Sequence, residues 1–594
     1  MTWEAWFTLV IAVGTVVLLV RDQVAPAVAV LGADMSLMLA GVIDPGAAFA
    51  GFSNPAPVTV AALFVVARAV EKTGALQPLV AAALGNGRGH GNEPGRLRLA
   101  RLLAPTAGAS AFLNNTPIVA MLAPQVADWA TKRGMSPSRL LMPISFATIL
   151  GGMLTVVGTS TNLVVSGLLE QAGLAPIGMF EITRVGFPVA VVGVAFLILF
   201  SGMLLPDRRT ARQTMQEESR EYVMQMVVAR SGALDGLSVE DAGLRHLEGV
   251  FLAEVRRREE VIAPAAPETV LLGGDQLTFV GRVDVVRDLQ GMRGLVSAER
   301  KHELHGDEGV HTFFEAVVSG ASALVGKTLA ESEFRSRFQA VVIAIHRAGS
   351  RVNAKLGTVR IKEGDTLLLL ADRGFRERWR DRNEFLLVSH LGGSPPVSTR
   401  KALLVGLITF AIVAIAGAGL LPILHASLLG AFAMIGFGVL TPGEARNALD
   451  ADVLVVIAAS FGIGAAMEQS GLAAGLGEGI VGGFAQWGPV AVLLAVVLAT
   501  VALTELITNN AAAVLVFPIA ISIAAELGLD PRPFAIAIAI AASASFLTPI
   551  GYQTNTMVYG LGGYRFTDFV RLGFPLTIAV IAATVLFVPV FWPF

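Results

Sequence analysis

Two stretches of sequence, LNNTPIVAMLAP at 113–124 and ITNNAAAVLVFP at 507–518, decide the fold of this chain of 594 residues. Each is an apolar run with a polar interruption, Asn-Asn-Thr at 114–116 and Thr-Asn-Asn at 508–510. Polar, non-helical backbone at membrane depth is tolerated only where protein buries it or where it lines a wet cavity. The two interruptions therefore predict a ligand site inside a membrane protein.

The two stretches belong to an internal duplication. Three further pairs of motifs match in the same order, with offsets between 393 and 397 residues. They are GVIDPG at 41–46 with GVLTPG at 438–443, VEKTGAL at 70–76 with MEQSGLA at 467–473, and VVGTSTNLVVSG at 156–167 with PIGYQTNTMVYG at 549–560. Chance does not readily give four matches in one order, so we interpret the chain as two related halves.

Composition places both halves in a membrane. The chain is 54% hydrophobic and 15% charged, with a mean hydropathy of +0.66, whereas soluble domains carry roughly 25% charged residues. Most of the charge lies between residues 206 and 401, and the flanks contain runs of about 20 apolar residues, the length that crosses a bilayer. The absence of cysteine excludes disulfides and thiolate metal sites. No basic stripe with interleaved aromatic residues suggests nucleic acid.

We expect three blocks: membrane repeat 1 (1–205), an insert (206–400) and membrane repeat 2 (401–594). Each repeat has five spans and one broken segment, 99–130 or 488–525, whose arms we expect to be too short to cross alone. The expected spans are 4–20, 25–43, 56–71, 140–171 and 184–205, then 402–421, 425–440, 452–470, 533–560 and 572–592. The first is interpreted as a retained span, because it lacks a basic n-region and a cleavage site.

Five spans per repeat would insert the second repeat upside down. Basic residues favour cytoplasmic loops, and their distribution predicts a cytoplasmic insert with both termini outside. The predicted fold class is an α-helical, multi-pass protein of the cell membrane, with two inverted repeats, one re-entrant hairpin in each, and a cytoplasmic α/β insert. Inverted repeats with helices broken near the midplane indicate the binding site of a secondary transporter.

The residues at the interruptions can bind ions through neutral polar groups. They carry hydroxyls and carboxamides, and helix ends add free carbonyls for a cation or N–H groups for an anion. The alternative for any one interruption is hydrogen bonding between helices. Glu505, four residues before Asn509, is expected to shape the second hairpin, with a proton site as the alternative.

In these motifs the chain resembles the divalent-anion/sodium symporter family of the ion transporter superfamily. That family has two hairpins tipped by Ser-Asn-Thr, each followed by an unwound helix. Here the tips read 114–116 and 508–510, each with the central Asn, and the unwound helices fall at 158–162 and 548–555. The Thr-Pro-Pro-Asn of the common family form is absent. The resemblance implies a homodimer, an elevator mechanism and Na⁺ as the coupling cation, with sulfate favoured and a four-carbon dicarboxylate as the alternative.

The resemblance also implies the site residues. The anion would contact Asn114, Asn115, Thr116, Thr159, Thr508, Asn509, Asn510 and Thr548. One Na⁺ would be held by Ser110, Asn114, Asn115 and Gly158, and a second by Thr504, Asn509 and the carbonyls of Ile507 and Leu547.

The insert holds a shorter duplication, in which Gly-Asp at 274–275 matches Gly-Asp at 364–365 at an offset of 90. Each unit is expected to run strand, small helix, strand, Gly-Asp turn and closing strand. The units, near 222–292 and 313–383, resemble the C-terminal domain of potassium-channel and Trk-type subunits (TrkA-C, or RCK C-terminal, domains). The resemblance leaves open a regulatory sensor for a small ligand or a passive dimerisation spacer.

A regulated ion channel and an enzyme are the alternative classes of function. A regulated ion channel is suggested by the insert, but inverted repeats with paired hairpins favour a carrier. An enzyme is disfavoured, because no Ser/His/Asp set, metal cluster or nucleotide loop occurs, and no organic cofactor is expected.

Overall fold

The computed structural model describes residues 2–594 with gaps. The gaps are 22–23, 77–94, 134, 209–221, 245–249, 258–259, 263–264, 282–293, 298–310, 321, 348–349, 353–355, 373, 380–383 and 391–398. The chain divides into two compact units, Met1–Arg208 with Pro395–Phe594, and Arg209–Ser394. The first unit is helical and the second is built on strands, and each is described by itself.

The two halves of the helical unit have the same order of helices. The first half contains α1 (Trp3–Arg21), α2 (Pro26–Leu39), α3 (Pro45–Phe49), η1 (Ala50–Ser53), α4 (Pro55–Thr73), α6 (Gly95–Ser110), α7 (Asn115–Lys132), α8 (Ser138–Gly152), α9 (Ser160–Gln171) and α10 (Thr183–Leu204). The second contains α15 (Thr399–Gly417), α16 (Ile423–Gly436), α17 (Pro442–Asn447), α18 (Ala451–Gln469), α19 (Leu472–Phe484), η3 (Ala485–Trp487), α20 (Pro489–Thr504), α21 (Asn509–Leu527), α22 (Arg532–Ser543), α23 (Gln553–Leu561) and α24 (Phe566–Phe591). The counterpart of α19 would fall within 77–94, outside the described residues.

The matched motifs have matched local structure. Asp44 accepts a hydrogen bond from Ala47 N (3.0 Å) and caps α3, while Thr441 accepts one from Glu444 N (3.2 Å) and caps α17. In both motifs a proline follows at the first helical position, where its missing N–H costs nothing. The duplication in the sequence is therefore also a duplication in local folding.

Within the part of the chain that the structure describes, seven helices are long and apolar enough to be candidate spans. They are Trp3–Arg21, Pro45–Thr73, Thr183–Leu204, Arg400–Gly417, Ala451–Gln469, Asn509–Leu527 and Phe566–Phe591. Four shorter apolar helices add Pro26–Leu39, Ile423–Gly436, Pro489–Thr504 and Arg532–Ser543. The expectation that both arms of each broken segment are too short is wrong for α21, whose 19 residues are long and apolar enough to cross a membrane. The inverted orientation of the repeats stays a prediction.

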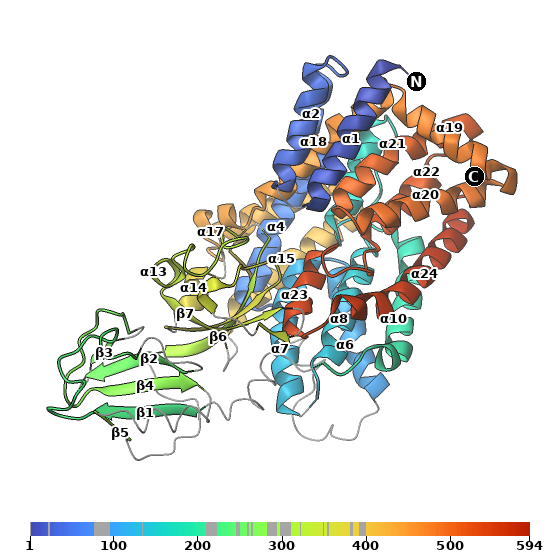
Figure 1. The fold of residues 1–594 in the computed structure, drawn as a ribbon. Helices are drawn as coiled ribbons and strands as arrows, with labels where there is room; N and C mark the ends of the chain where they lie inside the picture. Colours follow the sequence, from blue (N-terminus) through green and yellow to red (C-terminus); the bar gives the residue numbers. More distant parts are fainter. Residues whose placement is uncertain are drawn as a thin grey trace. The chain divides into compact units, whose positions relative to one another are not determined.

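Helices of one half pack against helices of the other. The pair α2 and α18 and the pair α4 and α16 are crossed counterparts, and α10 packs against α24. The hairpin arm α7 contacts α23, while α9 contacts α21 and α22. Figure 1 shows α23, from the second half, beside α7, from the first. The broken segments of the two halves therefore meet within one body.

The strand unit contains two antiparallel sheets of the same design. The first has the order β3-β2-β4-β1-β5, built from β1 (Tyr222–Val228), β2 (Val250–Arg257), β3 (Glu260–Ile262), β4 (Gln276–Gly281) and β5 (Leu295–Ser297). The second has the order β10-β6-β9-β7-β8, built from β6 (His311–Val318), β7 (Ala340–Arg347), β8 (Ser350–Arg351), β9 (Thr366–Asp372) and β10 (Phe385–His390). When the strands of each sheet are numbered from the start of its own unit, and the second sheet is read from its other edge, the two strand orders are the same. The offset of 90 between the units predicts this.

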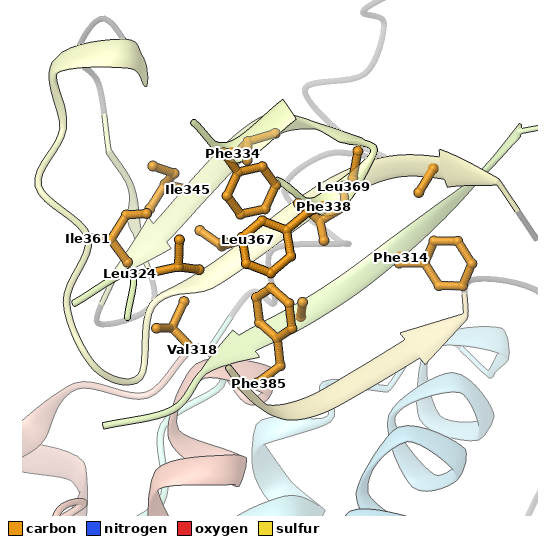
Figure 2. Close-up of a cluster of buried hydrophobic side chains, with 14 of the residues drawn as sticks. Phe314, Val318, Leu324, Phe334, Phe338, Ile345, Ile361, Leu367, Leu369 and Phe385 are labelled. Carbon is orange, nitrogen blue, oxygen red and sulfur yellow. The ribbon is translucent and has the colours of Figure 1, made fainter. Parts of the chain in front are cut away.

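The second sheet packs on a core of aromatic and aliphatic side chains supplied partly by α13 (Phe334–Phe338) and α14 (Phe375–Trp379). Figure 2 shows Phe338 between Phe334 and Phe385, and the ring centroids lie 4.5 Å and 5.5 Å apart. These rings are buried, and such pairs contribute about 0.5–1.5 kcal/mol beyond their area. Parts of both predicted TrkA-C-like units, including 282–292 and 380–383, lie outside the described residues.

An ion pair is repeated in the two sheets. Arg257 forms a bidentate pair with Asp275, and Arg347 forms the same pair with Asp365, each with a closest N–O distance of 2.7 Å. Both aspartates are buried, and Asp365 Oδ2 also accepts from Lys362 N (2.8 Å). The Gly-Asp turns of the sequence motif thus fix each closing strand through a buried carboxylate.

We predict that Arg347→Ala destabilises the second sheet by about 2–3 kcal/mol, because it leaves the Asp365 carboxylate buried without its guanidinium partner. Hydrogen exchange of peptides from β7 and β9 in the full-length protein would then be accelerated by roughly 30- to 100-fold. Arg360→Ala is the control, because Arg360 is exposed and its guanidinium contacts exposed groups, the Gly326 carbonyl (2.6 Å) and the Glu331 carboxylate (3.6 Å). Equal exchange in the two variants would contradict the prediction.

Candidate functional site

Each hairpin tip is closed by the same hydrogen bond. In the first, Ser110 Oγ donates to Asn115 Oδ1 (2.5 Å), and in the second, Thr504 Oγ1 donates to Asn509 Oδ1 (2.9 Å). Both pairs join the last residue of one arm to the first residue of the next. Because the amide oxygen is held within the hairpin, the NH₂ group of each Asn is available for a partner outside it.

The helix that follows each hairpin is broken, and an asparagine secures each break. The first break separates α8 from α9, where Asn162 Nδ2 donates to Thr155 O (2.8 Å) and Gly152 O (3.3 Å). In the second, between α22 and α23, Asn555 Nδ2 donates to Ser545 O (3.0 Å) and Thr548 O (3.2 Å). All three residues of each set are related by an offset of 393. The side-chain amides thus satisfy carbonyls that the broken helices leave free.

Close backbone packing also explains the glycine of the first break. A Cβ added to Gly158 would lie 2.5 Å from Gly152 O, a separation that real Cβ atoms do not show. Any other residue at 158 would push the two sides of the break apart. The conformation of this predicted cation ligand is therefore tied to its having no side chain.

The tip of each hairpin contacts the break of the opposite repeat. Thr116 Oγ1 donates to Gln553 Oε1 (3.2 Å), and the counterpart contact joins Ser160 Oγ to Asn510 Oδ1 (3.3 Å). Thr161 Oγ1 also donates to Asn510 Oδ1 (3.1 Å). These residues begin α7, α9, α21 and α23, so the N-termini of four helices converge on one polar cluster. The C-termini of α6 and α20 lie on the other side of each tip.

A tyrosine lies at the centre of this cluster. Asn115 Nδ2 donates to the Tyr552 hydroxyl (2.6 Å), and Thr159 Oγ1 lies 3.5 Å from the same hydroxyl. Through it, three predicted site elements (the first tip, the first break and the second break) meet at one atom. Sequence reasoning missed Tyr552 as a site residue, although the repeat offset of 393 pairs it with Thr159.

Other predicted residues have more local contacts. Thr508 is exposed and caps α21 by accepting from Ala511 N (3.4 Å), and Thr548 Oγ1 accepts from Gly551 N (2.9 Å). Ile507 is buried and Leu547 half-buried, while Asn114 is half-buried. Asn114 lines a mostly apolar pocket together with Phe112, Val157, Ser160 and residues of α4 and α15. The structure thus joins Asn115, Thr116, Thr159 and Asn510 into one cluster and does not add Thr508 to it by any hydrogen bond among the described residues.

Glu505 has a defined structural role. Its Oε1 accepts from Phe546 N (2.7 Å) and Leu547 N (2.8 Å), both in the second break. The repeat offset of 394 pairs Glu505 with Ala111, and there the Ala111 carbonyl accepts from the Thr155 hydroxyl instead. The carboxylate therefore holds the second hairpin against its break, as the sequence suggested, and makes the two halves of the site chemically unequal.

Comparison with known proteins agrees with this architecture. A family model described as a citrate transporter (CitMHS) matches residues 16–525 and 488–593. The chain belongs to the citrate transporter family. This family lies in the ion transporter superfamily, so that expectation is confirmed. The protein is a multi-pass membrane transporter and not an enzyme.

Three relatives cover nearly the whole chain of this transporter. It is 35% identical to the "putative sulfur deprivation response regulator" of Chlamydomonas reinhardtii over 96% of this chain and 98% of the relative. It is 36% identical to an uncharacterized transporter of Synechocystis sp. over 93% and 91%. It is 24% identical to "sodium/sulfate cotransporter 1" of Chlamydomonas reinhardtii over 97% and 89%. The match to the divalent-anion/sodium symporter family stays a prediction.

Proposed function

We propose that this transporter carries a small divalent oxyanion, sulfate first, across the cell membrane in symport with Na⁺. The observation that supports it best is the convergence of four helix N-termini on the cluster formed by Thr116, Ser160, Asn510 and Gln553. Helix N-termini carry free N–H groups and the positive ends of helix dipoles, and they bind anions without charged side chains. Two relatives whose names mention sulfur or sulfate support the choice of anion.

Neutral donors suit a fully ionised oxyanion. The tips carry no Arg or Lys, so the anion would be held by hydroxyls, amide N–H groups and backbone N–H groups. Hydrogen bonds to a charged group contribute about 1.5–3 kcal/mol each, so a few of them are enough for binding. A dianion bound this way keeps most of its charge, which makes accompanying cations favourable.

Cations would bind at the opposite ends of the broken segments. The carbonyls at the C-termini of α6 and α20, with the Asn115 and Asn509 side chains, are oxygen ligands of the kind that replace water around Na⁺. We place the two Na⁺ ions at the predicted sets, Ser110, Asn114, Asn115 and Gly158, and Thr504, Ile507, Asn509 and Leu547. Because Asn115 and Asn509 would serve both a cation and the anion, the two kinds of ligand would bind cooperatively.

The resemblance to the divalent-anion/sodium symporter family supports proposals for movement, assembly and the insert. The hairpins and broken helices would move as an elevator against the other helices of a homodimer. The insert would be a cytoplasmic regulatory or dimerising module of two TrkA-C-like units. A four-carbon dicarboxylate, or citrate as the family description names it, is the second candidate substrate.

Uptake into proteoliposomes tests the proposal. We expect sulfate and thiosulfate to accumulate when a Na⁺ gradient is present, and succinate and citrate to accumulate much less. Replacing Na⁺ by choline or imposing a proton gradient alone is the control. Uptake of citrate or succinate in preference to sulfate would establish the second candidate, and uptake without Na⁺ would overturn the coupling.

A further inference from the structure

Tyr552 occupies a position at which the two repeats carry different residues. It directly precedes α23, as Thr159 directly precedes α9, and the two residues have nearly the same extended backbone, with φ of −143° and −145°. Neither side chain caps its own helix. The backbone of the two breaks is therefore the same at this position, and only the side chains differ, a phenol against a threonine.

The longer side chain reaches across the cluster. The Tyr552 hydroxyl is 2.6 Å from Asn115 Nδ2, on the tip of the opposite hairpin. The counterpart contact, between Thr159 and Asn509, is not among the hydrogen bonds of the described residues. The phenol thus places a hydroxyl at the tip of the first hairpin, whereas no hydrogen bond of the described residues joins the shorter threonine of the first repeat to the second tip.

The Tyr552 hydroxyl has no close hydrogen-bond acceptor for its proton among the described residues. Because Asn115 donates to it, the hydroxyl oxygen is the acceptor in that contact, and its O–H must find another partner. The other polar group near it in the described cluster is Thr159 Oγ1, at 3.5 Å, far beyond the usual 2.7–2.8 Å between two hydroxyls. An anion oxygen bound between the tips would give this proton an acceptor.

We infer that Tyr552 determines which anion the transporter selects. Its hydroxyl donates to the bound oxyanion, and its ring fills part of the polar cluster beside the first tip, so that a compact tetrahedral dianion fits better than an elongated di- or tricarboxylate. The inference rests on the proposed function, because it names the group that sets the selectivity of the same site. A threonine, as in the first repeat and at the same place in the Thr-Pro-Pro-Asn of the common family form, would supply neither the reach nor the ring.

Two variants separate the hydroxyl from the ring. Binding of radiolabelled sulfate to the purified full-length protein in Na⁺ would be measured, with succinate and citrate as competitors. Tyr552→Phe keeps the ring and should weaken sulfate about tenfold or more, the loss of one hydrogen bond to a charged group. Tyr552→Thr copies the first repeat and should also raise the affinity for succinate relative to sulfate, by about tenfold. Tyr559→Phe, on the same helix, is the control and should change neither.

The outcomes distinguish this inference from the proposed function. Wild-type protein that binds none of the anions would overturn the proposed function and this inference with it. Wild-type protein that binds sulfate, with both variants unchanged in affinity and in the ratio of succinate to sulfate, would overturn the inference alone. If the smaller side chain lowers the melting temperature, Tyr552→Phe decides, because it removes a single oxygen atom.

Discussion

Asn115→Ala and Asn509→Ala are each expected to reduce Na⁺-dependent anion uptake by at least about a hundredfold. Each asparagine accepts from a hydroxyl of its own hairpin, and Asn115 also donates to Tyr552. The substitution removes one predicted ligand shared by the cation and the anion, and two charged contacts are together worth about 3 kcal/mol or more. Initial rates of sulfate uptake into proteoliposomes, at matched amounts of protein, measure the effect.

The control for Asn115 is Gln125→Ala. Gln125 carries the same amide nearly three turns further along α7 and donates to Met121 O (3.0 Å) within its own helix. The Gln125→Ala variant should retain nearly full Na⁺-dependent uptake. Full uptake by either asparagine variant would show that the matched positions in the two tips are not part of the site. Equal melting temperatures of the three variants would confirm that the loss is in binding and not in folding.

The second large effect is expected from Gly186→Ala and Gly573→Ala. A Cβ added to Gly186 on α10 would lie 2.2 Å from Met153 O, and one added to Gly573 on α24 would lie 2.0 Å from Phe546 O. Met153 and Phe546 are counterparts, at an offset of 393, in the two breaks. In each repeat, the helix that follows the break therefore contacts the break through a glycine. A methyl group at that glycine must displace backbone.

Both variants should lose stability although alanine is the better helix former. Overpacking of this kind costs about 1–3 kcal/mol or more, against a gain of about 1 kcal/mol from helix propensity. Gly202→Ala, also on α10, is the matched control, because nothing lies within 4 Å of the added Cβ, and it should be neutral or stabilising. Melting temperatures of the purified full-length variants measure the difference. An equal or higher melting temperature for Gly573→Ala than for Gly202→Ala would contradict the packing described for the breaks.

The places where helices end could be predicted, because a polar interruption in an apolar run can be recognised from the sequence alone. The tips near 114–116 and 508–510 and the breaks near 158 and 551 are found where the motifs place them. The arm lengths were less predictable, because α21 continues through Pro518 as far as Leu527. A proline lowers the expectation of a helix locally, but apolar neighbours on both sides sustain it.

The partners of the polar side chains could not be predicted in the same way. The repeat alignment pairs Tyr552 with Thr159, but which hairpin the phenol reaches depends on how α23 packs against α7. Glu505 was identified as a residue that shapes the second hairpin, but the donors to its carboxylate, the backbone N–H groups of Phe546 and Leu547, could not be read from the sequence. Both sets of contacts join residues that are 41 to 437 positions apart and are properties of packing, which hydrophobic periodicity does not encode.

Sulfate counterflow measures whether the two tips and two breaks form one cation-coupled anion site of a carrier. Proteoliposomes loaded with unlabelled sulfate and diluted into trace labelled sulfate, with Na⁺ on both sides, should transiently concentrate the label. The accumulation should vanish when choline replaces Na⁺ and in Asn115→Ala. Simple equilibration of the label with no overshoot, or an overshoot that persists without Na⁺, would contradict the account.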